Sequence, residues 1–228
     1  MSEIQQENVS SGSPQNATMR QHSTSAHNAD GFEDSCSLYE RGFCFMDGNG
    51  VEANAVEGAK CWLQAAKQGH DEAQNLIGNC YLNGCGVKRN ENEAVKWYRK
   101  SAMQGNDRAQ VNIGYCYFQG IGVNKDANEA IYWFNKAATQ ENLDAYDWLG
   151  ICYQEGAGVN QDVNKAVFWF RKAAERGHYI AQYHLGRCFS DGIGVKIDIV
   201  EALRWFRKAA DQGYELAIGM YEMYSRRF

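Results

Sequence analysis

A Gly-x-Gly-Val string returns every 36 residues along this chain, without insertions. Its five copies begin at Gly48, Gly84, Gly120, Gly156 and Gly192. Other residues, among them Gly78 and Trp97, return with the same step. A fixed period of this length is typical of a solenoid, in which each unit stacks on its neighbours. The period therefore predicts a repeat array over residues 35–228.

The period divides the array into five units and a C-terminal remainder. Units 1 to 5 cover residues 35–70, 71–106, 107–142, 143–178 and 179–214, and residues 215–228 form a further half-unit. Glu222 occupies the position where the complete units have glycine, because this helix has no second helix to approach. We therefore expect the half-unit to be a capping helix.

Each unit carries the signals of two helices, as unit 2 illustrates. The first helix has an apolar stripe of helical period, formed by Ala73, Ile77, Cys80 and Tyr81. Gly84 ends it, and a capping box of Asn90 and Glu93 then begins a second helix, which ends at Gly105. Each unit is thus predicted to be an αα-hairpin, and the fold class to be all-α.

A glycine recurs within the predicted first helix, at Gly78 in unit 2. Such a glycine costs about 1 kcal/mol of helix stability relative to alanine, so its recurrence needs a compensating gain. We expect the backbone of the second helix to approach closely there, because Ala94 and Ala102 on that helix are also small. The large tryptophan and its aromatic neighbour are then expected to pack between units.

The N-terminal segment differs from the array in composition. Residues 1–34 are rich in Ser, Gln and Asn and contain the only proline, so they cannot bury enough apolar surface to offset the entropy of ordering. We predict a disordered tail, either plain padding or a phosphorylated docking arm. Unit 1 has small or polar residues at core positions, which suits a terminal unit: Ser37, Arg41, Gly58 and Cys61.

Composition and charge exclude several classes of function. Basic residues number 23 against 28 acidic ones, so the chain lacks the positive field that nucleic acids or anionic membranes attract. No apolar run approaches the roughly 18 residues that span a bilayer, and the first residues lack the features of a secretory signal. We expect no nucleic-acid partner, no membrane insertion, and a cytoplasmic or nuclear location.

Motifs of known catalytic sites are also missing. The chain has no His-Glu-x-x-His, no Gly-x-x-x-x-Gly-Lys-Ser/Thr and no Ser-x-x-Lys sequence. The recurrent Gly-x-Gly follows no predicted strand, so it indicates a turn rather than a phosphate-binding loop. His70 and His178 share one repeat position, just after a helix-ending glycine, and are predicted to be structural. We expect no enzyme activity, no cofactor and no metal.

The repeat motif resembles a known family. The string Ala-x-x-x-Leu-Gly-x-x-Tyr-x-x-Gly-x-Gly-Val-x-x-Asp-x-x-x-Ala-x-x-Trp-Phe-x-Lys-Ala-Ala-x-x-Gly is similar to the Sel-one-like repeat, a relative of the tetratricopeptide repeat, and Ala145 through Gly177 match it almost position for position. The resemblance covers residues 35–228. It implies a right-handed α/α superhelical solenoid and a role as an adaptor that assembles protein complexes.

The cysteines depart from one branch of that family. The secreted, cysteine-rich branch pairs two cysteines per repeat in disulfides, and some of its members are linked to β-lactam binding or hydrolysis. Here one cysteine recurs per unit, at Cys44, Cys80, Cys116, Cys152 and Cys188. Equivalent positions on stacked helices lie about 10 Å apart, beyond the ~7 Å limit for a disulfide, so we predict small buried apolar residues. A redox or metal role for Cys80 with Cys85 stays open.

The repeats provide an internal control for locating a binding surface. Positions that stay constant between units are expected to maintain the shared fold. Positions that vary between units are not constrained by the fold and are available for another function. On the first helices the variable positions face away from the constant stripe, toward the inner wall that these helices line in the related family. The predicted partner-binding residues of this concave groove are Arg108, Asn112, Tyr115, Asp144, Trp148, Ile151, His184 and Arg187.

Trp148 is the only tryptophan off the core pattern, and Tyr115 and Ile151 are expected beside it. An exposed aromatic cluster flanked by charges has the composition of a binding hot spot. The alternative is that Trp148 packs sideways on a neighbouring helix. The first interpretation predicts a non-enzymatic scaffold that holds a partner peptide or helix. A regulatory activator subunit of a larger enzyme complex and a β-lactam-hydrolase-like enzyme are the other hypotheses, and the oligomeric state stays open.

Overall fold

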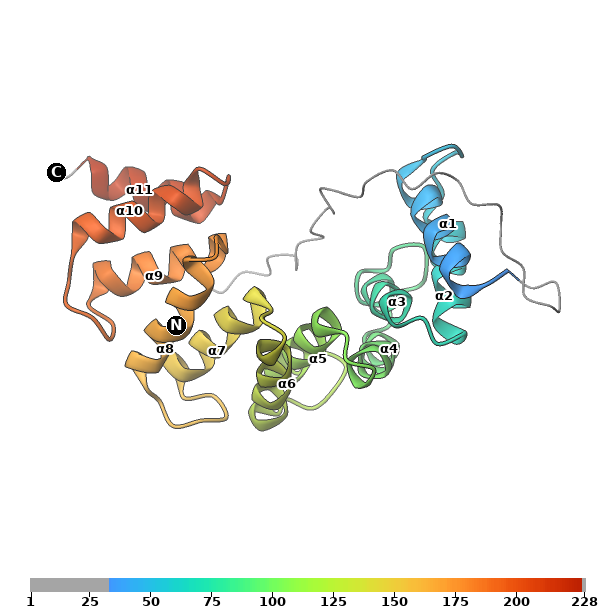
Figure 1. Cartoon of the computed structure of the whole chain (residues 1–228), viewed down its shortest axis with the longest axis horizontal. Coiled ribbons are helices and arrows are strands. Elements are labelled where there is room, and N and C mark those ends of the chain that lie inside the picture. The colour runs from blue at the N-terminus through green and yellow to red at the C-terminus, as the bar shows by residue number, and fades with distance from the viewer. Residues whose placement is uncertain (1–32, 227–228) are drawn as a thin grey trace.

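The computed structural model describes residues 33–226, which contain eleven α-helices arranged as a curved arch (Figure 1). The first helices of the units are α1 (Ser35–Asp47), α3 (Asp71–Asn83), α5 (Asp107–Gln119), α7 (Leu143–Glu155) and α9 (Tyr179–Asp191). The second helices are α2 (Ala55–Lys67), α4 (Glu91–Met103), α6 (Ala127–Thr139), α8 (Val163–Ala174) and α10 (Ile199–Ala210). Helix α11 (Glu215–Ser225) packs on α10. The chain is therefore an all-α solenoid of stacked hairpins.

Side-chain caps begin the helices at the predicted positions. Asn90 accepts a hydrogen bond from the backbone N–H of Glu93, and Asp126 does the same for Glu129. The first helices are capped too, because Nδ1 of His178 accepts from the N–H of Ala181. His70 caps α3 in the same way. The prediction that these histidines are structural is thus confirmed.

The recurrent glycines lie against aromatic rings, which corrects the expected partner. A Cβ placed on Gly114 would lie 2.7 Å from Cε1 of Phe134 on the second helix of the same unit. The remaining pairs of this kind are Gly42–Trp62, Gly78–Tyr98, Gly150–Phe170 and Gly186–Phe206. Close approach is confirmed, but a ring occupies the space where the sequence suggested helix backbone. The glycine is needed because a packed core ring cannot move aside cheaply.

The recurrent tryptophans join neighbouring units. Trp97 of unit 2 belongs to a core cluster that includes Trp62 of unit 1, and Trp133 of unit 3 packs with Tyr98 of unit 2. Trp205 similarly joins Phe170 across units 5 and 4. The adjacent aromatic residue instead fills its own hairpin against the glycine. The tryptophan therefore packs between units, whereas the adjacent ring packs against the glycine of its own unit and, for Phe134, also on Trp148 of the next unit.

Glutamines form a second link between units, which the sequence reasoning missed. Nε2 of Gln104 donates to the carbonyl of Gly69 at 3.1 Å and to Oε1 of Gln74 at 2.8 Å. Gln140 and Gln212 repeat this pattern one and three units later. Their 36-residue spacing was a usable signal. This glutamine clamp gives the carbonyl at the end of one unit a partner from the next.

The eight cysteines are all free, in agreement with the sequence argument against disulfides. Burial raises the pKa of the thiols of Cys116, Cys152 and Cys188 to about 12, so they stay protonated. Burial and the neighbouring thiol of Cys85 raise the pKa of Cys80 to about 12 as well. Cys80 thus lacks the lowered pKa of a reactive thiol. Cys44 is only half-buried, unlike its equivalents.

Unit 1 and helix α11 form the two ends of the array. Apart from Glu33 and Asp34, the tail predicted to be disordered lies outside the described residues. In unit 1, Nε of Arg41 approaches Sγ of Cys61 at 3.4 Å, and its guanidinium pairs with Glu33. At the other end, Glu222 on α11 is exposed. None of the helices within residues 33–226 is long and apolar enough to cross a membrane.

Candidate protein-interaction surface

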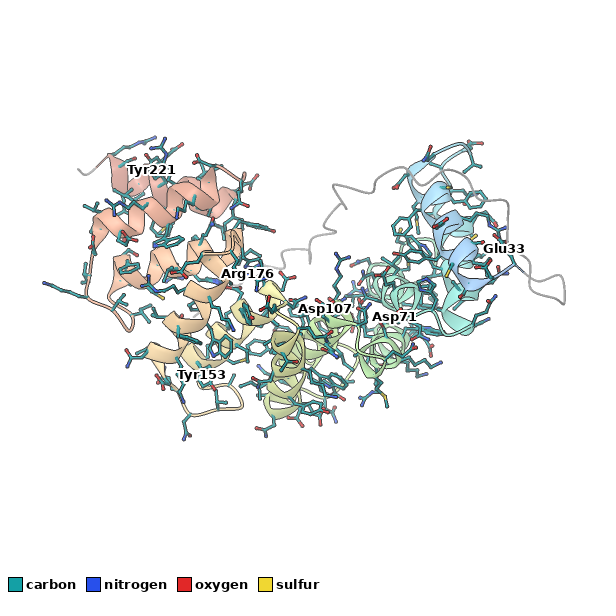
Figure 2. The ribbon with its side chains drawn as sticks, in the orientation of Figure 1. Glu33, Asp71, Asp107, Tyr153, Arg176 and Tyr221 are labelled. Carbon is teal, nitrogen blue, oxygen red and sulfur yellow. The ribbon has the colours of Figure 1, made fainter. Side chains whose placement is uncertain are left out.

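The candidate residues come from three neighbouring first helices, α5, α7 and α9. In Figure 1, α3, α5 and α7 lie on the inner side of the arch, with α4, α6 and α8 outside them. Figure 2 shows Asp107 and Arg176 along this inner margin. The first helices α3, α5 and α7 therefore line the inner side of the arch, as the family resemblance implied.

Trp148 and Tyr115 lie side by side on this wall. Their ring centroids are 5.3 Å apart, with the ring planes tilted by 48°. Trp148 also stacks on Phe134 at 5.6 Å and contacts Phe118 at 5.3 Å. Both Trp148 and Tyr115 are half-buried rather than exposed. The expectation of an exposed cluster is corrected, because Trp148 packs sideways on unit 3 while keeping part of its surface open.

Ile151 lies one helical turn beyond Trp148 on α7. It is half-buried and packs against the core clusters on both sides of its unit. Burial of the phenol raises the pKa of Tyr115, so its hydroxyl stays neutral and available as a hydrogen-bond donor. These three residues give the middle of the inner wall an apolar character.

Two candidate residues form polar contacts with the preceding unit. Nδ2 of Asn112 donates to Oδ1 of Asn75 at 2.8 Å. One of the ring nitrogens of His184, Nδ1, lies 2.8 Å from Oδ1 of Asp147. Asn75 and Asp147 are buried, at 6% and 4% exposure, and were not among the predicted residues. Their shared repeat position varies between units, which could have revealed them.

The charged candidates lie nearer to solvent. Arg108, Asp144 and Arg187 are exposed, and Arg187 pairs with Asp191 at 3.1 Å. Asp144 Oδ1 lies 2.9 Å from Nε2 of His178. Burial of His178 lowers its pKa, but the hydrogen bond to Asp144 and the nearby carboxylates outweigh this, so the pKa is raised overall. The histidine that caps α9 therefore also links units 4 and 5.

Together these contacts divide the eight candidates into two groups. The half-buried ones, centred on Trp148, hold neighbouring units together and expose part of their surface. The exposed ones are Arg108, Asp144 and Arg187. Within residues 33–226, no group of three or more His, Cys, Asp and Glu side chains is placed to hold a metal ion.

Similarity to known proteins agrees with the fold. The Sel1 repeat profile matches residues 37–70, 71–106, 107–142, 143–178 and 180–214. A comparison with curated proteins found no significant match. Repeats of this family generally mediate protein–protein interaction.

Two solved structures show the likeness in more detail. A Sel1 repeat protein from Oxalobacter formigenes superposes with a TM-score of 0.79 at 36% identity, covering 82% of this chain and 75% of its own. The protein c5321, a protective antigen of uropathogenic Escherichia coli with an SLR fold, superposes with a TM-score of 0.72, also at 36% identity. That match covers 80% of this chain but only 39% of c5321. On this evidence the chain belongs to the Sel1 repeat family.

Proposed function

We propose that this protein is a non-enzymatic interaction scaffold that holds a peptide or helix of a partner protein along the inner wall of units 3 to 5. The observation that carries the proposal is the pair formed by Tyr115 and Trp148. Equivalent positions to Trp148 hold Leu76, Asn112 and His184, so the shared fold does not require a tryptophan there. A partly open tryptophan beside a tyrosine supplies a large apolar contact of the kind that anchors protein interfaces.

The charges around the aromatic pair support a partner with both apolar and polar side chains. Arg108 and Arg187 are exposed cations on α5 and α9, and Asp144 is an exposed anion on α7 between them. Charges placed at the rim of an apolar patch contribute more to specificity than to affinity. The inner wall thus offers an anchor at its centre and selective contacts at its edges.

The buried thiols favour a binding role over catalysis. With the pKa of each raised to about 12, Cys116, Cys152 and Cys188 are poor nucleophiles at neutral pH. They serve as small apolar residues in the core. The recurrent cysteine, which is the most obvious reactive group of the repeat, is therefore assigned to packing.

Affinity capture from an extract of the source cells, followed by mass spectrometry, tests the proposal. Trp148→Ala combined with Tyr115→Ala should remove the proteins that the wild type captures, while the helical circular dichroism is retained. Because Trp148 also stacks on Phe134, this variant is expected to be less stable as well.

Arg108→Glu with Arg187→Glu therefore provides the cleaner variant, since both side chains are exposed and the ion pair of Arg187 with Asp191 lies at the surface. Its melting temperature should match the wild type, and the captured set should be reduced. Capture of the same proteins by both double variants would show that the inner wall is not the binding surface.

A further inference from the structure

The second helices carry an ion pair that recurs on their exposed face. Lys60 pairs with Glu57 at 2.6 Å in unit 1, three residues apart on α2. The same pair forms between Lys96 and Glu93 in unit 2, and between Arg204 and Glu201 in unit 5. The position thus normally holds a solvent-exposed cation, and stacking of the units makes no demand for an apolar side chain there.

Units 3 and 4 break this pattern with aromatic residues. Tyr132 on α6 and Phe168 on α8 occupy the position of the cation, with 48% and 57% of their surface exposed. Each ring meets the edge or face of the following tryptophan, at 5.1 Å for Tyr132 and 5.2 Å for Phe168. Units 3 and 4 thus expose aromatic rings at a position where the fold accepts a charged side chain. Exposed apolar surface of this kind indicates contact with another molecule.

The rings have cationic surroundings. Lys136 Nζ lies 4.9 Å from the ring centroid of Tyr132, one helical turn along α6. On α8, Lys172 lies one turn after Phe168, with Nζ 5.2 Å from the ring centroid of the neighbouring Trp169. Lys165 and Arg171 also flank Phe168 in sequence, but they pair with Asp162 and Glu175. Glu129 is the only carboxylate at the corresponding spacings of three or four residues from either ring. The patch therefore combines exposed aromatic surface with ammonium groups, in a chain whose net charge is −5.

We propose that the outer faces of α6 and α8 form a second docking surface, for a partner protein segment that carries acidic side chains beside aromatic or aliphatic ones. Carboxylates of such a segment would pair with Lys136 and Lys172, while its apolar side chains cover Tyr132 and Phe168. In Figure 1 these helices lie on the outside of the arch, opposite the inner wall. This surface is independent of the inner wall and can be occupied when the inner wall is full or empty.

The test uses a random copolymer of glutamate and tyrosine as the probe, with polyglutamate of equal length as its control. The wild type should bind the copolymer at least about tenfold more tightly than polyglutamate, because only the copolymer offers rings to Tyr132 and Phe168. The informative variant is Tyr132→Lys with Phe168→Lys, which restores the residue type of Lys60 and Lys96. It adds two positive charges, so simple charge attraction would strengthen binding, whereas the proposal requires about tenfold weaker binding.

Two further double variants, and vesicles of phosphatidylserine as a second probe, complete the experiment. Lys136→Glu with Lys172→Glu should also weaken binding of the copolymer, and the loss should shrink at high salt. Arg108→Glu with Arg187→Glu on the inner wall should leave the affinity for the copolymer within twofold.

Equal or tighter binding by the lysine variant would overturn the proposal. So would loss of copolymer binding in the inner-wall variant, or tight binding to phosphatidylserine vesicles without binding to the copolymer. Circular dichroism of each variant establishes that it is folded.

Discussion

The junction between units 3 and 4 is built differently from the other junctions that follow unit 1. Elsewhere a neutral glutamine spans the junction, as Gln140 does from unit 3 to the carbonyl of Gly105 in unit 2. Between units 3 and 4 that glutamine is Arg176, which pairs through its guanidinium with Glu141 at 3.2 Å. Tyr146 replaces the second glutamine of the clamp. An exposed ion pair thus stands where the other junctions have a network of amide hydrogen bonds.

The backbone differs at the same place. Glu141 has φ of +62°, where the equivalent residues of the other units are glycines, such as Gly105 at +101° and Gly177 at +94°. A side chain in this left-handed region carries a strain of about 1–2 kcal/mol. Trp148 of the inner wall and Phe168 of the outer face both lie in unit 4. Several departures of the inner units from the repeat therefore lie in units 3 and 4, which also carry parts of both proposed binding surfaces.

The largest effect is expected from the glycine that the regular units share. Gly114→Leu should lower the free energy of unfolding by roughly 3 kcal/mol or more, because the new side chain overlaps the ring of Phe134 that also stacks on Trp148. Denaturant titration measures the change. Gly219→Leu on α11 is the control, since a Cβ there meets no atom within 4 Å. Equal destabilisation by both would contradict the packing role of the recurrent glycine.

Replacing the junction residues with alanine should distinguish the glutamine junctions from the arginine junction by the loss in unfolding free energy. Gln140→Ala should cost about 1–2 kcal/mol, because it removes hydrogen bonds to Gly105 and Gln110 in a partly buried network. Arg176→Ala should cost less than about 1 kcal/mol, since the ion pair with Glu141 is exposed and screened. Chemical denaturation of the two variants tests the difference. A larger loss for Arg176→Ala would mean that the ion pair is the stronger clamp.

Restoring glycine at the unusual junction should have a smaller effect of opposite sign. Glu141→Gly should raise the free energy of unfolding by about 0.5–1 kcal/mol, as relief of backbone strain exceeds the lost ion pair and the added freedom of the unfolded chain. Gly105→Glu is the reciprocal variant and should be destabilising. A stability decrease in Glu141→Gly would show that the charge matters more than the backbone conformation.

The smallest effect is a pH dependence at the next junction. The pKa of His178 is raised above its ordinary 6.5, so below that pH the ion pair of the protonated ring with Asp144 stabilises the fold by more than is lost when protonated Nδ1 no longer accepts from Ala181. This contribution is lost as the pH rises through the folded pKa. Relative to His178→Asn, which copies the caps of α5 and α7, the wild type should thus lose stability as the pH rises from 6.5 through the raised folded pKa. Melting curves across this range measure the effect, and it should be diminished in Asp144→Asn. A constant difference between wild type and His178→Asn would contradict the assignment.

Much of the fold could be predicted from the sequence, because the 36-residue period and helical spacing depend on local order. The period located the hairpins, the second-helix caps such as Asn90, and the close approach at Gly114. It could not show that the approaching group is the ring of Phe134, because spacing places a residue on a face but does not give its rotamer. The caps formed by His70 and His178 were missed because histidine is not among the usual capping residues.

The surface was harder to predict than the fold. A helical wheel placed Trp148 on the inner wall, and the structure puts it beside Tyr115 as expected. A helical wheel cannot show that Trp148 packs against Phe134 of the preceding unit. Such a contact depends on the angle between neighbouring hairpins, and the periodicity of the sequence does not determine that angle. For the same reason Asp147, one residue before Trp148, was overlooked as the partner of His184.

The central claim is that residues constant between units hold the array together, whereas the exposed variable residues of the inner wall bind a partner. Its most direct test measures unfolding free energy and partner capture together, in Arg108→Glu/Arg187→Glu and in Gly78→Leu, which overpacks Tyr98 in unit 2. We predict that the first variant keeps the wild-type stability within about 0.5 kcal/mol and loses its partner, while the second is destabilised and still captures the partner as far as it is folded. Capture by the arginine variant at the wild-type level, with stability unchanged, would contradict the claim.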